Sequence, residues 1–452
     1  MIQALQLLLS LSILIAFHEG GHFIAARMFK TRVEKFYLFF DFLFPLPGVL
    51  NFSLFKKKVG DTEYGLGWFP LGGYVQISGM IDESLDTEAL KKPAQPWEFR
   101  SKPAWQRLII MLGGIIVNVL LAFLIYAMVL FVWGEDKLPM TEVKAGITAS
   151  DSLSKSLGFQ TGDKIVTVDG KTIEYYNDLI PAVISAKQIV VEREGKQVNL
   201  DLPVDLIDKI ATNQKASLLP PRIPFYIDDM NDTLLNAKTG FKRFDKIVAL
   251  NDSVKVTYFD EWKGLIKDKK NQTITVTVLR NGQEVKIPNV KVSAEGSTEL
   301  DFISSIKQLD SLKEMRLVHT DYGFFASFPA GVKMTFTKLG QYIDQFKLIL
   351  SPSTGGYKHV GGFISMGKIF GSEWVWEDFW IRTAFISIIL AFMNLLPIPA
   401  LDGGHVLFTL WEMITRRAPS VKFLTYAQYV GMAFLLLLML YANGNDIIGL
   451  FK

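Results

Sequence analysis

The segment LLLSLSILIAFHEGGHFIAA, residues 7–26, decides how the fold of this chain is interpreted. No charged side chain occurs in residues 1–17, and Glu19 is the only charged side chain before Arg27. About 20 apolar residues suffice to cross the hydrocarbon core of a bilayer. A secretory signal would begin with Lys or Arg and end at a small-residue cleavage site, and this segment has neither in place. The segment therefore predicts a membrane-spanning helix.

Three further apolar stretches are long enough to cross a bilayer. They are residues 108–132, 379–401 and 423–441. Hydrophobic residues make up 49% of the 452 residues, and they concentrate at the two ends, while the middle third has the composition of a soluble protein. We therefore expect a multi-pass α-helical membrane protein with four transmembrane helices and a folded region between the second and the third.

The overall charge and the residue types exclude several classes of protein. The net charge is only +3, and no basic tract with interleaved aromatic residues occurs, so the sequence predicts no nucleic-acid partner. The chain has no cysteine, which excludes disulfide bonds, thiolate catalysis and cysteine-ligated metals.

Lysine and arginine residues near the ends of the spans predict the orientation of the chain, because cytoplasmic loops carry an excess of them. They cluster after the first span, before the second span, and between the third and fourth spans: Arg27, Lys30, Arg32, Lys35, Lys56, Lys57, Lys58, Arg100, Lys102, Arg107, Arg416, Arg417 and Lys422. We expect these loops in the cytoplasm. Both termini and residues 134–378 then lie outside it.

The external stretch contains an approximate internal repeat. Residues 157–170, LGFQTGDKIVTVDG, are echoed by residues 239–252, TGFKRFDKIVALND. Each copy has the pattern of a short strand between turns. Each is followed by two strand patterns that a hairpin signal joins, Glu194-Gly195 in the first copy and Asn281-Gly282 in the second. The stretch is therefore predicted to hold two small β-rich domains.

Two further segments have distinctive patterns. Residues 36–55 hold eight aromatic side chains without a helical period, and residues 64–78 continue with Gly and alternating apolar residues. We interpret this region as β-hairpins that partly enter the bilayer, where non-helical backbone survives only if protein or a water-filled cavity satisfies it. Residues 331–350 mix apolar residues with charged ones at near-helical spacing, a pattern typical of a helix in the membrane surface.

The motif HEGGH, residues 18–22, lies inside the first predicted span. On a helix, residues i and i+4 fall on one face, so His18 and His22 can bind one metal ion with Glu19 beside it. Neutral imidazoles are good zinc ligands, and a catalytic zinc keeps one position for water. The metal lowers the pKa of that water, and an adjacent carboxylate then takes its proton. Only five histidines occur in the chain, so a chance match to this motif is improbable.

The alternative is a buried histidine pair that merely flanks a glutamate. A carboxylate and two imidazoles are costly at bilayer depth and usually mark function there. The two glycines also weaken the helix by about 1 kcal/mol each relative to alanine, which suggests that something must approach closely at these positions. We therefore favour a metal site.

A catalytic zinc site needs a third protein ligand, and the third predicted span supplies a candidate. The segment NLLPIPALDGGH, residues 394–405, interrupts an apolar helix with two prolines and a glycine pair. These residues open the helix and bring Asp402 inward, where a carboxylate oxygen would complete a set of two nitrogens, one oxygen and a water. Taken alone, Asp402 would indicate an Asp-Gly turn at a helix end. His405 is expected near the site without binding the metal, and His319 and His359 are expected at the surface.

These motifs resemble those of the site-2 protease family of intramembrane metalloproteases. The resemblance covers nearly the whole chain. Its motifs are HEGGH at residues 18–22, PLGGYV at residues 70–75, the Gly113-Gly114 pair and Asn118 in the second span, and residues 394–405. The first and last of these motifs, in this order and spacing, are highly specific.

The resemblance implies roles for individual residues. His18, His22 and Asp402 would bind zinc (Zn²⁺), and Glu19 would act as the general base and acid. Asn394 resembles the family asparagine that helps to hold the substrate. The segment 64–78 resembles a membrane re-entrant β-element, and its open edge would pair with an unwinding substrate by strand addition.

The resemblance also implies how the chain is divided. The expected parts are a first membrane half at 1–139, PDZ-like domains at 140–222 and 223–298, a linker with amphipathic surface helices at 299–378, and a second membrane half at 379–452. The chain would lie in a bacterial inner membrane with its PDZ-like domains outside the cytoplasm and its active site toward the cytoplasmic side. Its partners would be the lipid bilayer and single-span membrane proteins, such as anti-sigma factors and remnant signal peptides.

Two other functions remain to be weighed against an intramembrane protease. A non-enzymatic membrane scaffold with PDZ-like domains and a vestigial metal site would have no need of Glu19. A metal transporter would need polar residues through several spans, and the second and fourth spans lack them. Neither copy of the repeat shows an obvious Gly-Leu-Gly-Phe carboxylate-binding loop, so the external domains are expected to screen substrates by size.

Overall fold

The computed structural model describes residues 1–43, 49–70, 72–80, 93–213, 218–229, 231 and 233–451. Leu71 of the PLGGYV motif, part of the aromatic segment, and Lys452 at the predicted external C-terminus lie outside the described residues. The chain forms two compact units. The first consists of Met1–Gly134, Asp321–Phe346 and Lys358–Lys452, and the second of Glu135–Thr320 and Lys347–Tyr357.

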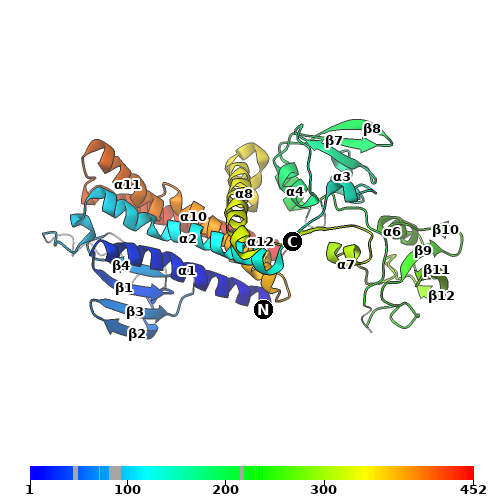
Figure 1. Ribbon diagram of the computed structural model, residues 1–452, viewed down its shortest axis with the longest axis horizontal. Helices are drawn as coiled ribbons and strands as arrows, with labels where there is room; N and C mark the ends of the chain where they lie inside the picture. Colours follow the sequence, from blue (N-terminus) through cyan, green and yellow to red (C-terminus); the bar gives the residue numbers. More distant parts are fainter. Residues whose placement is uncertain are drawn as a thin grey trace. The chain divides into compact units, whose positions relative to one another are not determined.

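Within its described residues, the first unit has four helices that are long and apolar enough to cross a membrane, as the sequence predicted. They are α1 (Ile2–Met28), α2 (Ala104–Trp133), α10 (Trp376–Leu395) and α12 (Val421–Leu450). Helices α1, α2 and α10 lie side by side (Figure 1). A helix that is apolar all round is suited to lipid and to helix neighbours rather than to water. The chain is thus a membrane protein with additional β-sheets.

The third span differs from the prediction in where it ends. The span was expected to reach residue 401, with its helix opened by the prolines and glycines of residues 394–405; α10 ends at Leu395, and a new helix, α11 (Asp402–Thr415), begins at Asp402. Pro397 and Pro399 explain the break, because proline has no N–H for the helix ladder and its ring clashes with the preceding turn. Ala400 adopts a φ of +75°, a left-handed conformation that a helix does not contain.

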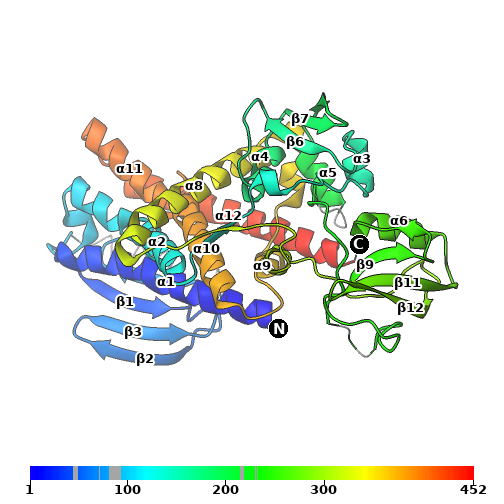
Figure 2. The ribbon, with the colours of Figure 1, turned by 45° about the vertical axis from the view of Figure 1, so that its right-hand side comes forward.

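A four-stranded sheet, in the order β2-β3-β1-β4, lies along α1 (Figure 2). Its strands are β1 (Val33–Leu38), β2 (Ser53–Val59), β3 (Thr62–Gly67) and β4 (Tyr74–Ile77). The prediction of a hairpin at 64–78 was wrong, because β3 and β4 pair with opposite sides of β1, β3 in parallel and β4 antiparallel. The hairpin of this sheet is β2–β3. Gly65 permits the parallel pairing, because a side chain there would overlap the ring of Tyr37 on β1.

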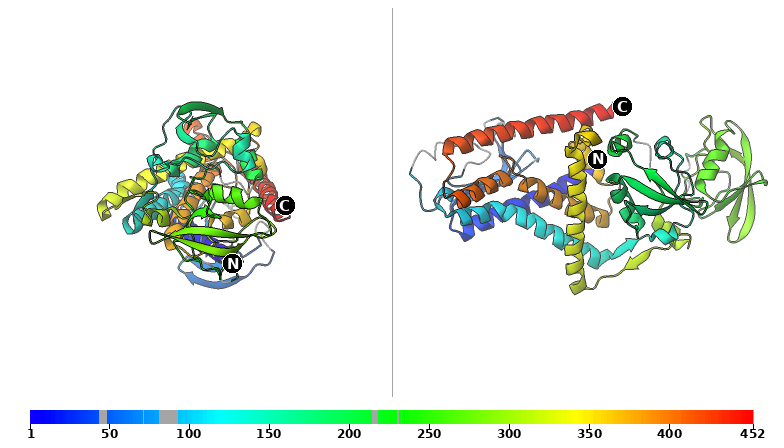
Figure 3. Two further views of the ribbon diagram at one scale, coloured as in Figure 1. Left: turned by 90° about the vertical axis from the view of Figure 1, so that its right-hand side faces the viewer. Right: turned by 90° about the horizontal axis from the view of Figure 1, so that it is seen from above.

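Helix α8 (Phe324–Leu350) contains the segment that was expected to be an amphipathic surface helix. It crosses α2, as the right-hand view of Figure 3 shows, where Gly331 lies against the backbone of Ala127. A Cβ on Gly331 would lie 2.7 Å from the Ala127 nitrogen, so this crossing requires glycine. Short helix α9 (Phe363–Ile369) follows and contacts both α1 and α12. Placement of α8 in the membrane surface stays a prediction.

The second unit contains two separate hydrophobic cores, each built around an antiparallel sheet. The first core has β6 (Lys164–Val168), β7 (Gln188–Arg193), β8 (Lys196–Asp201), α3 (Ser152–Ser156), α4 (Tyr176–Ile184) and α5 (Leu206–Thr212). The second has β9 (Lys246–Leu250), β10 (Val254–Lys255), β11 (Thr273–Arg280), β12 (Gln283–Lys291) and α6 (Phe259–Lys267). Both hairpins, β7–β8 and β11–β12, occur at the predicted turns. Asn281 and Gly282 have φ values of 51° and 80°, as a type I′ turn requires.

The two cores repeat one buried ion pair. Arg193, at the end of β7, donates to the carboxylate of Asp163 and to the carbonyl of Gly158. In the second core, Arg280 makes the same bonds to Asp245 and to the carbonyl of Gly240. The two aspartate side chains are only 0% and 1% exposed, so each depends on its arginine for charge compensation. The internal repeat read from the sequence is thus also a repeat of interactions.

A short two-stranded ribbon joins the beginning and end of residues 135–320. It pairs β5 (Glu135–Lys137) with β13 (Val318–Thr320). His319 on β13 lies 2.6 Å from the carboxylate of Asp136 on β5, so it is a bonded residue as well as an exposed one. Helix α7 (Ile306–Ser311) precedes this ribbon. Nearby Glu314 accepts hydrogen bonds from a tyrosine and a lysine of the second core, Tyr226 and Lys246, both at 2.6 Å.

Candidate metal centre and active site

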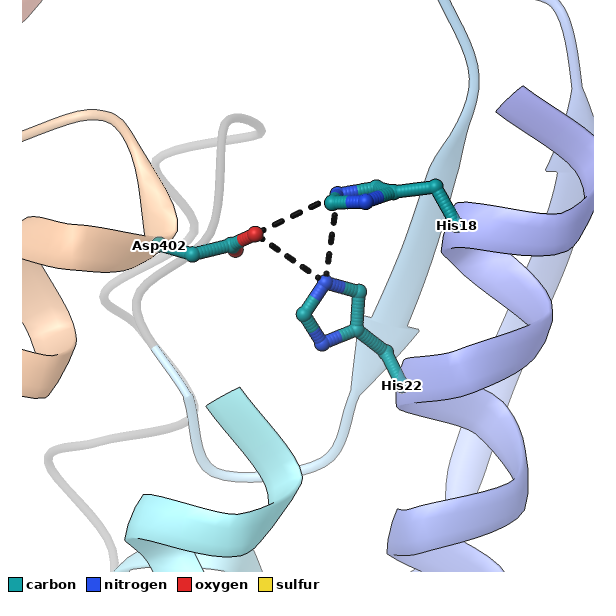
Figure 4. A group of neighbouring side chains, drawn as sticks. All are labelled: His18, His22 and Asp402. Atoms are coloured by element: carbon teal, nitrogen blue, oxygen red, sulfur yellow. Dashed lines mark hydrogen bonds and ion pairs between the residues drawn. The ribbon is translucent and has the colours of Figure 1, made fainter. Parts of the chain in front are cut away.

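Three of the predicted site residues converge inside the first unit. Helix α1 places His18 and His22 one turn apart on one face, and Asp402 comes from the first turn of α11. The His18 Nε2 and His22 Nε2 atoms each lie 3.2 Å from Asp402 Oδ2, and they lie 3.4 Å from each other. Figure 4 shows the three side chains pointing toward one another. Residues 380 positions apart in the sequence therefore form one cluster.

The spacing of these three atoms fits a tetrahedral zinc ion. Zinc binds nitrogen and oxygen ligands at about 2.0–2.2 Å, so two ligand atoms of a tetrahedral site lie about 3.3 Å apart. The observed separations of 3.2, 3.2 and 3.4 Å form a triangle of that size. Two imidazoles and one carboxylate are also a donor set that catalytic zinc sites use, with the fourth position left for water. The residues present fit zinc.

Neighbouring groups on α2 orient both imidazoles. The Nδ1–H of His22 donates to the backbone carbonyl of Ile110 at 2.9 Å, so its Nε2 keeps the lone pair that points into the cluster. The side-chain amide of Asn118 lies 3.2 Å from Nδ1 of His18, and its Oδ1 is buried without a partner among the described residues. The two ends of a carboxamide have the same shape. If Oδ1 faces His18, it accepts the Nδ1–H and leaves Nε2 of His18 free for a metal.

Glycines allow α1 and α2 to approach at the site, as the sequence suggested for the HEGGH motif. A Cβ on Gly21 would overlap the backbone of Gly113, and a Cβ on Gly114 would overlap both imidazoles. Gly20 has nothing within 4 Å of such an atom. The expectation of a close approach is therefore confirmed for Gly21 and wrong for Gly20.

The cluster opens into a chamber of about 350 Å³ within the first unit. Glu19 and Asn394 both line it, and the Asn394 side-chain nitrogen lies 3.3 Å from Nε2 of His18. Strand β4 contributes Val75 and Ile77, and helix α12 contributes Gln428, Met432 and Leu435. The chamber is mainly apolar, with its polar groups gathered near the metal ligands. Such a space suits an apolar chain segment that must meet a few polar groups.

The remaining histidines lie where they were expected. His405 lines the same chamber without belonging to the metal-ligand cluster. His359 and His319 are both exposed, and His319 is also bonded to Asp136. Sequence analysis gave Asn118 no role, although its position one turn beyond Gly114 on a helix facing the motif was a signal that could have revealed it. It gave Gln428 no role either, because a single glutamine in an apolar span carries no motif.

Comparison with known proteins shows one consistent set of similarities. The sequence model described as "Peptidase family M50" matches residues 6–438. A protein of Campylobacter jejuni is 28% identical over 99% of this chain and 93% of its own length, and one of Treponema pallidum is 26% identical over 98% of each chain. Both carry the name "Putative zinc metalloprotease". A Yersinia pestis protein named "Protease RseP" is 27% identical over 97% of each chain.

Proposed function

The chain belongs to peptidase family M50, the zinc-dependent site-2 protease family, and from this premise we propose that it cleaves transmembrane segments of single-span membrane proteins within the bilayer. One observation carries the proposal. Three ligand atoms stand at tetrahedral zinc spacing beside Glu19, in a chamber formed by membrane-spanning helices. A purely structural metal site would need neither the carboxylate of Glu19 nor the chamber.

The side chains divide the work of peptide hydrolysis among them. His18, His22 and Asp402 would hold the zinc ion. When bound there, zinc would supply a Lewis acid that polarises the scissile carbonyl and lowers the pKa of water to about 7. Glu19 then takes a proton from the attacking water and returns it to the leaving amine. Asn394, next to His18, holds the substrate backbone near the metal ligands.

The open edge of β4 provides a binding surface for the unwound substrate. Among the described strands, β4 pairs only with β1, and it contributes Val75 and Ile77 to the chamber. A substrate helix shields its own peptide bonds and must unwind before hydrolysis. An unwound segment at bilayer depth must still satisfy its backbone groups. If the segment is added to β4 as a further strand, hydrogen bonds to β4 would satisfy the backbone groups along one side of the segment.

The substrates and the setting are proposed from the family and from the sequence. We expect anti-sigma factors and remnant signal peptides, already trimmed outside the membrane, in a bacterial inner membrane. The Lys- and Arg-rich loops would face the cytoplasm, and both termini and residues 134–378 would face away from it. The two cores of the second unit would be the PDZ-like domains at 140–222 and 223–298. They would act as a size filter.

Replacement of Glu19 by glutamine tests the proposal. The substitution keeps the side-chain volume and leaves the three metal ligands in place, so zinc should remain bound. Cleavage of a single-span substrate in detergent should fall by about 10²–10⁴-fold, the usual contribution of a general acid–base group. A variant within threefold of wild type would remove Glu19 from the mechanism. A wild-type protein with bound zinc that cuts no single-span substrate would favour the scaffold.

A further inference from the structure

One polar side chain of the chamber that the proposed mechanism leaves unused is Gln428 of α12. Gln428 is only 4% exposed, and it lines the chamber from a helix that supplies neither a metal ligand nor Glu19. Its Oε1 accepts a hydrogen bond from the backbone N–H of Ala400 at 3.2 Å. A backbone N–H can only donate, so this bond fixes which end of the carboxamide is the oxygen.

The other end of the Gln428 carboxamide is a donor, and no hydrogen bond from its Nε2 to another described residue occurs. Helix α12 packs closely against the loop before Asp402 here, because Gly431, one turn further along, lies so close to Pro399 that a Cβ there would overlap its carbonyl. Gln428 therefore lines the chamber with one end of its carboxamide bonded to Ala400 and the other end uncommitted among the described residues.

A substrate strand needs donors of this kind. The carbonyl and N–H groups of an extended chain point alternately to its two sides, and pairing with β4 satisfies only one side. In a bilayer, no bulk water is available to the other side, and each unsatisfied group costs several kcal/mol. Of the two amides beside the metal ligands, Asn118 is engaged with Nδ1 of His18 at 3.2 Å, and Asn394, 3.3 Å from Nε2 of His18, serves the substrate only next to that imidazole.

From these contacts we propose that Gln428 is a substrate-binding residue, whose Nε2 donates to a backbone carbonyl of the unwound segment on the side away from β4. The inference rests on the proposed function, since it names a ligand for the same chamber. The recognised group is a peptide carbonyl, so binding is independent of substrate side chains.

Gln428→Met tests the proposal, because methionine has a similar length and flexibility but neither donates nor accepts here. Full-length protein in detergent should lose about tenfold in kcat/KM on a single-span substrate, the size of one buried hydrogen bond, while its zinc content stays at the wild-type level. Gln283→Met, an exposed position in the second unit, is the matched control and should leave cleavage unchanged.

A second variant separates a role of Gln428 in substrate binding from a role in supporting the loop that contains Ala400 and precedes Asp402. Ala400 has a φ of +75°, a conformation that glycine adopts freely. With Ala400→Gly, the loop should therefore keep its conformation without the hydrogen bond from residue 400 to Gln428. In the double variant Ala400→Gly/Gln428→Met, cleavage should stay low. Three outcomes would each overturn the proposal. They are loss of zinc from Gln428→Met protein, recovery of cleavage in the double variant, and a kcat/KM of Gln428→Met within twofold of wild type.

A binding measurement keeps this inference distinct from the proposed function. Glu19→Gln protein should retain uncut single-span substrate during co-purification, and Glu19→Gln/Gln428→Met should retain about tenfold less. Equal retention would overturn the role of Gln428 even if cleavage is confirmed. Failure of zinc-loaded wild-type protein to cleave any such substrate would instead refute the protease, and the retention comparison would still report on Gln428.

Discussion

Gly114→Ala should abolish zinc binding, although glycine is not a ligand. The Cβ of alanine would lie 2.6 Å from Cε1 and 2.7 Å from Nδ1 of His18, and it would overlap Nε2 of His22. Ordinary van der Waals contact begins at 3.4 Å, so the His18 ring must move by about 0.7 Å or more, given the usual carbon contact distances. Zinc–ligand distances tolerate only about 0.2 Å. The displacement is several times larger than the site can absorb.

The assay is the zinc content of purified protein, followed by titration with a competing chelator. Loss of orienting contacts alone lowers metal affinity by about 10–100-fold, and displacement of the ligands themselves should exceed that range. Gly20→Ala is the matched control, because nothing lies within 4 Å of its Cβ. It should keep zinc and stabilise α1 by about 1 kcal/mol through helix propensity. A Gly114→Ala protein that binds zinc with wild-type affinity would refute the packing argument.

Three further outcomes are expected. Asn118→Leu should weaken zinc binding by about 10–100-fold with the fold retained, because an imidazole loses the group that orients it; chelator competition measures this. Arg280→Met should destabilise the second unit by about 3 kcal/mol, since Asp245 would be left buried and unpaired, whereas removal of the exposed pair through Lys286→Met should cost less than about 1 kcal/mol; denaturant unfolding compares the two. Burial by itself would raise the pKa of Glu314, but its two hydrogen-bond partners outweigh this and lower its pKa below the usual 4.5. Its stabilising contribution is therefore present above that value and is lost as the pH falls through the lowered pKa, so acid should reduce amide protection in β9 of wild-type protein, and Glu314→Gln should lack this step.

Sequence patterns predicted the spans, the two external cores and the metal cluster because each depends on local chemistry. Apolar length defines a span, and paired histidines at i and i+4 define a helical face, with no knowledge of other elements. The Asn281-Gly282 hairpin was equally local, since few residues adopt two successive positive φ values. Asp402 required one long-range step, and the expectation that both motifs lie at the cytoplasmic ends of their spans was sufficient for it.

The parts that could not be predicted depend on partners far away in sequence. Strand pairing around β1 was missed because β3 and β4 follow each other closely and suggested a hairpin, while the choice depends on how Tyr37 packs over Gly65. Helix α11 (Asp402–Thr415) was not predicted, because the third span was expected to end near residue 401 and no element was assigned between it and the fourth span. The roles of Asn118 and Gln428 depend on contacts with His18 and Ala400, which lie 100 and 28 positions away.

The β5–β13 ribbon has a consequence for how this architecture can change over evolution. Glu135 and Thr320 are paired across the ribbon, so their Cα atoms lie about 5 Å apart. The first and last residues of a segment of nearly two hundred are thus neighbours, as in a domain inserted into a surface turn of a host protein. The second unit also includes Lys347–Tyr357, so the chain returns to it once after the ribbon is closed. His18, His22 and Asp402 all lie in the first unit, before Gly134 and after Lys358. Changes of length or sequence within residues 135–320 therefore leave the proposed metal-binding residues in place.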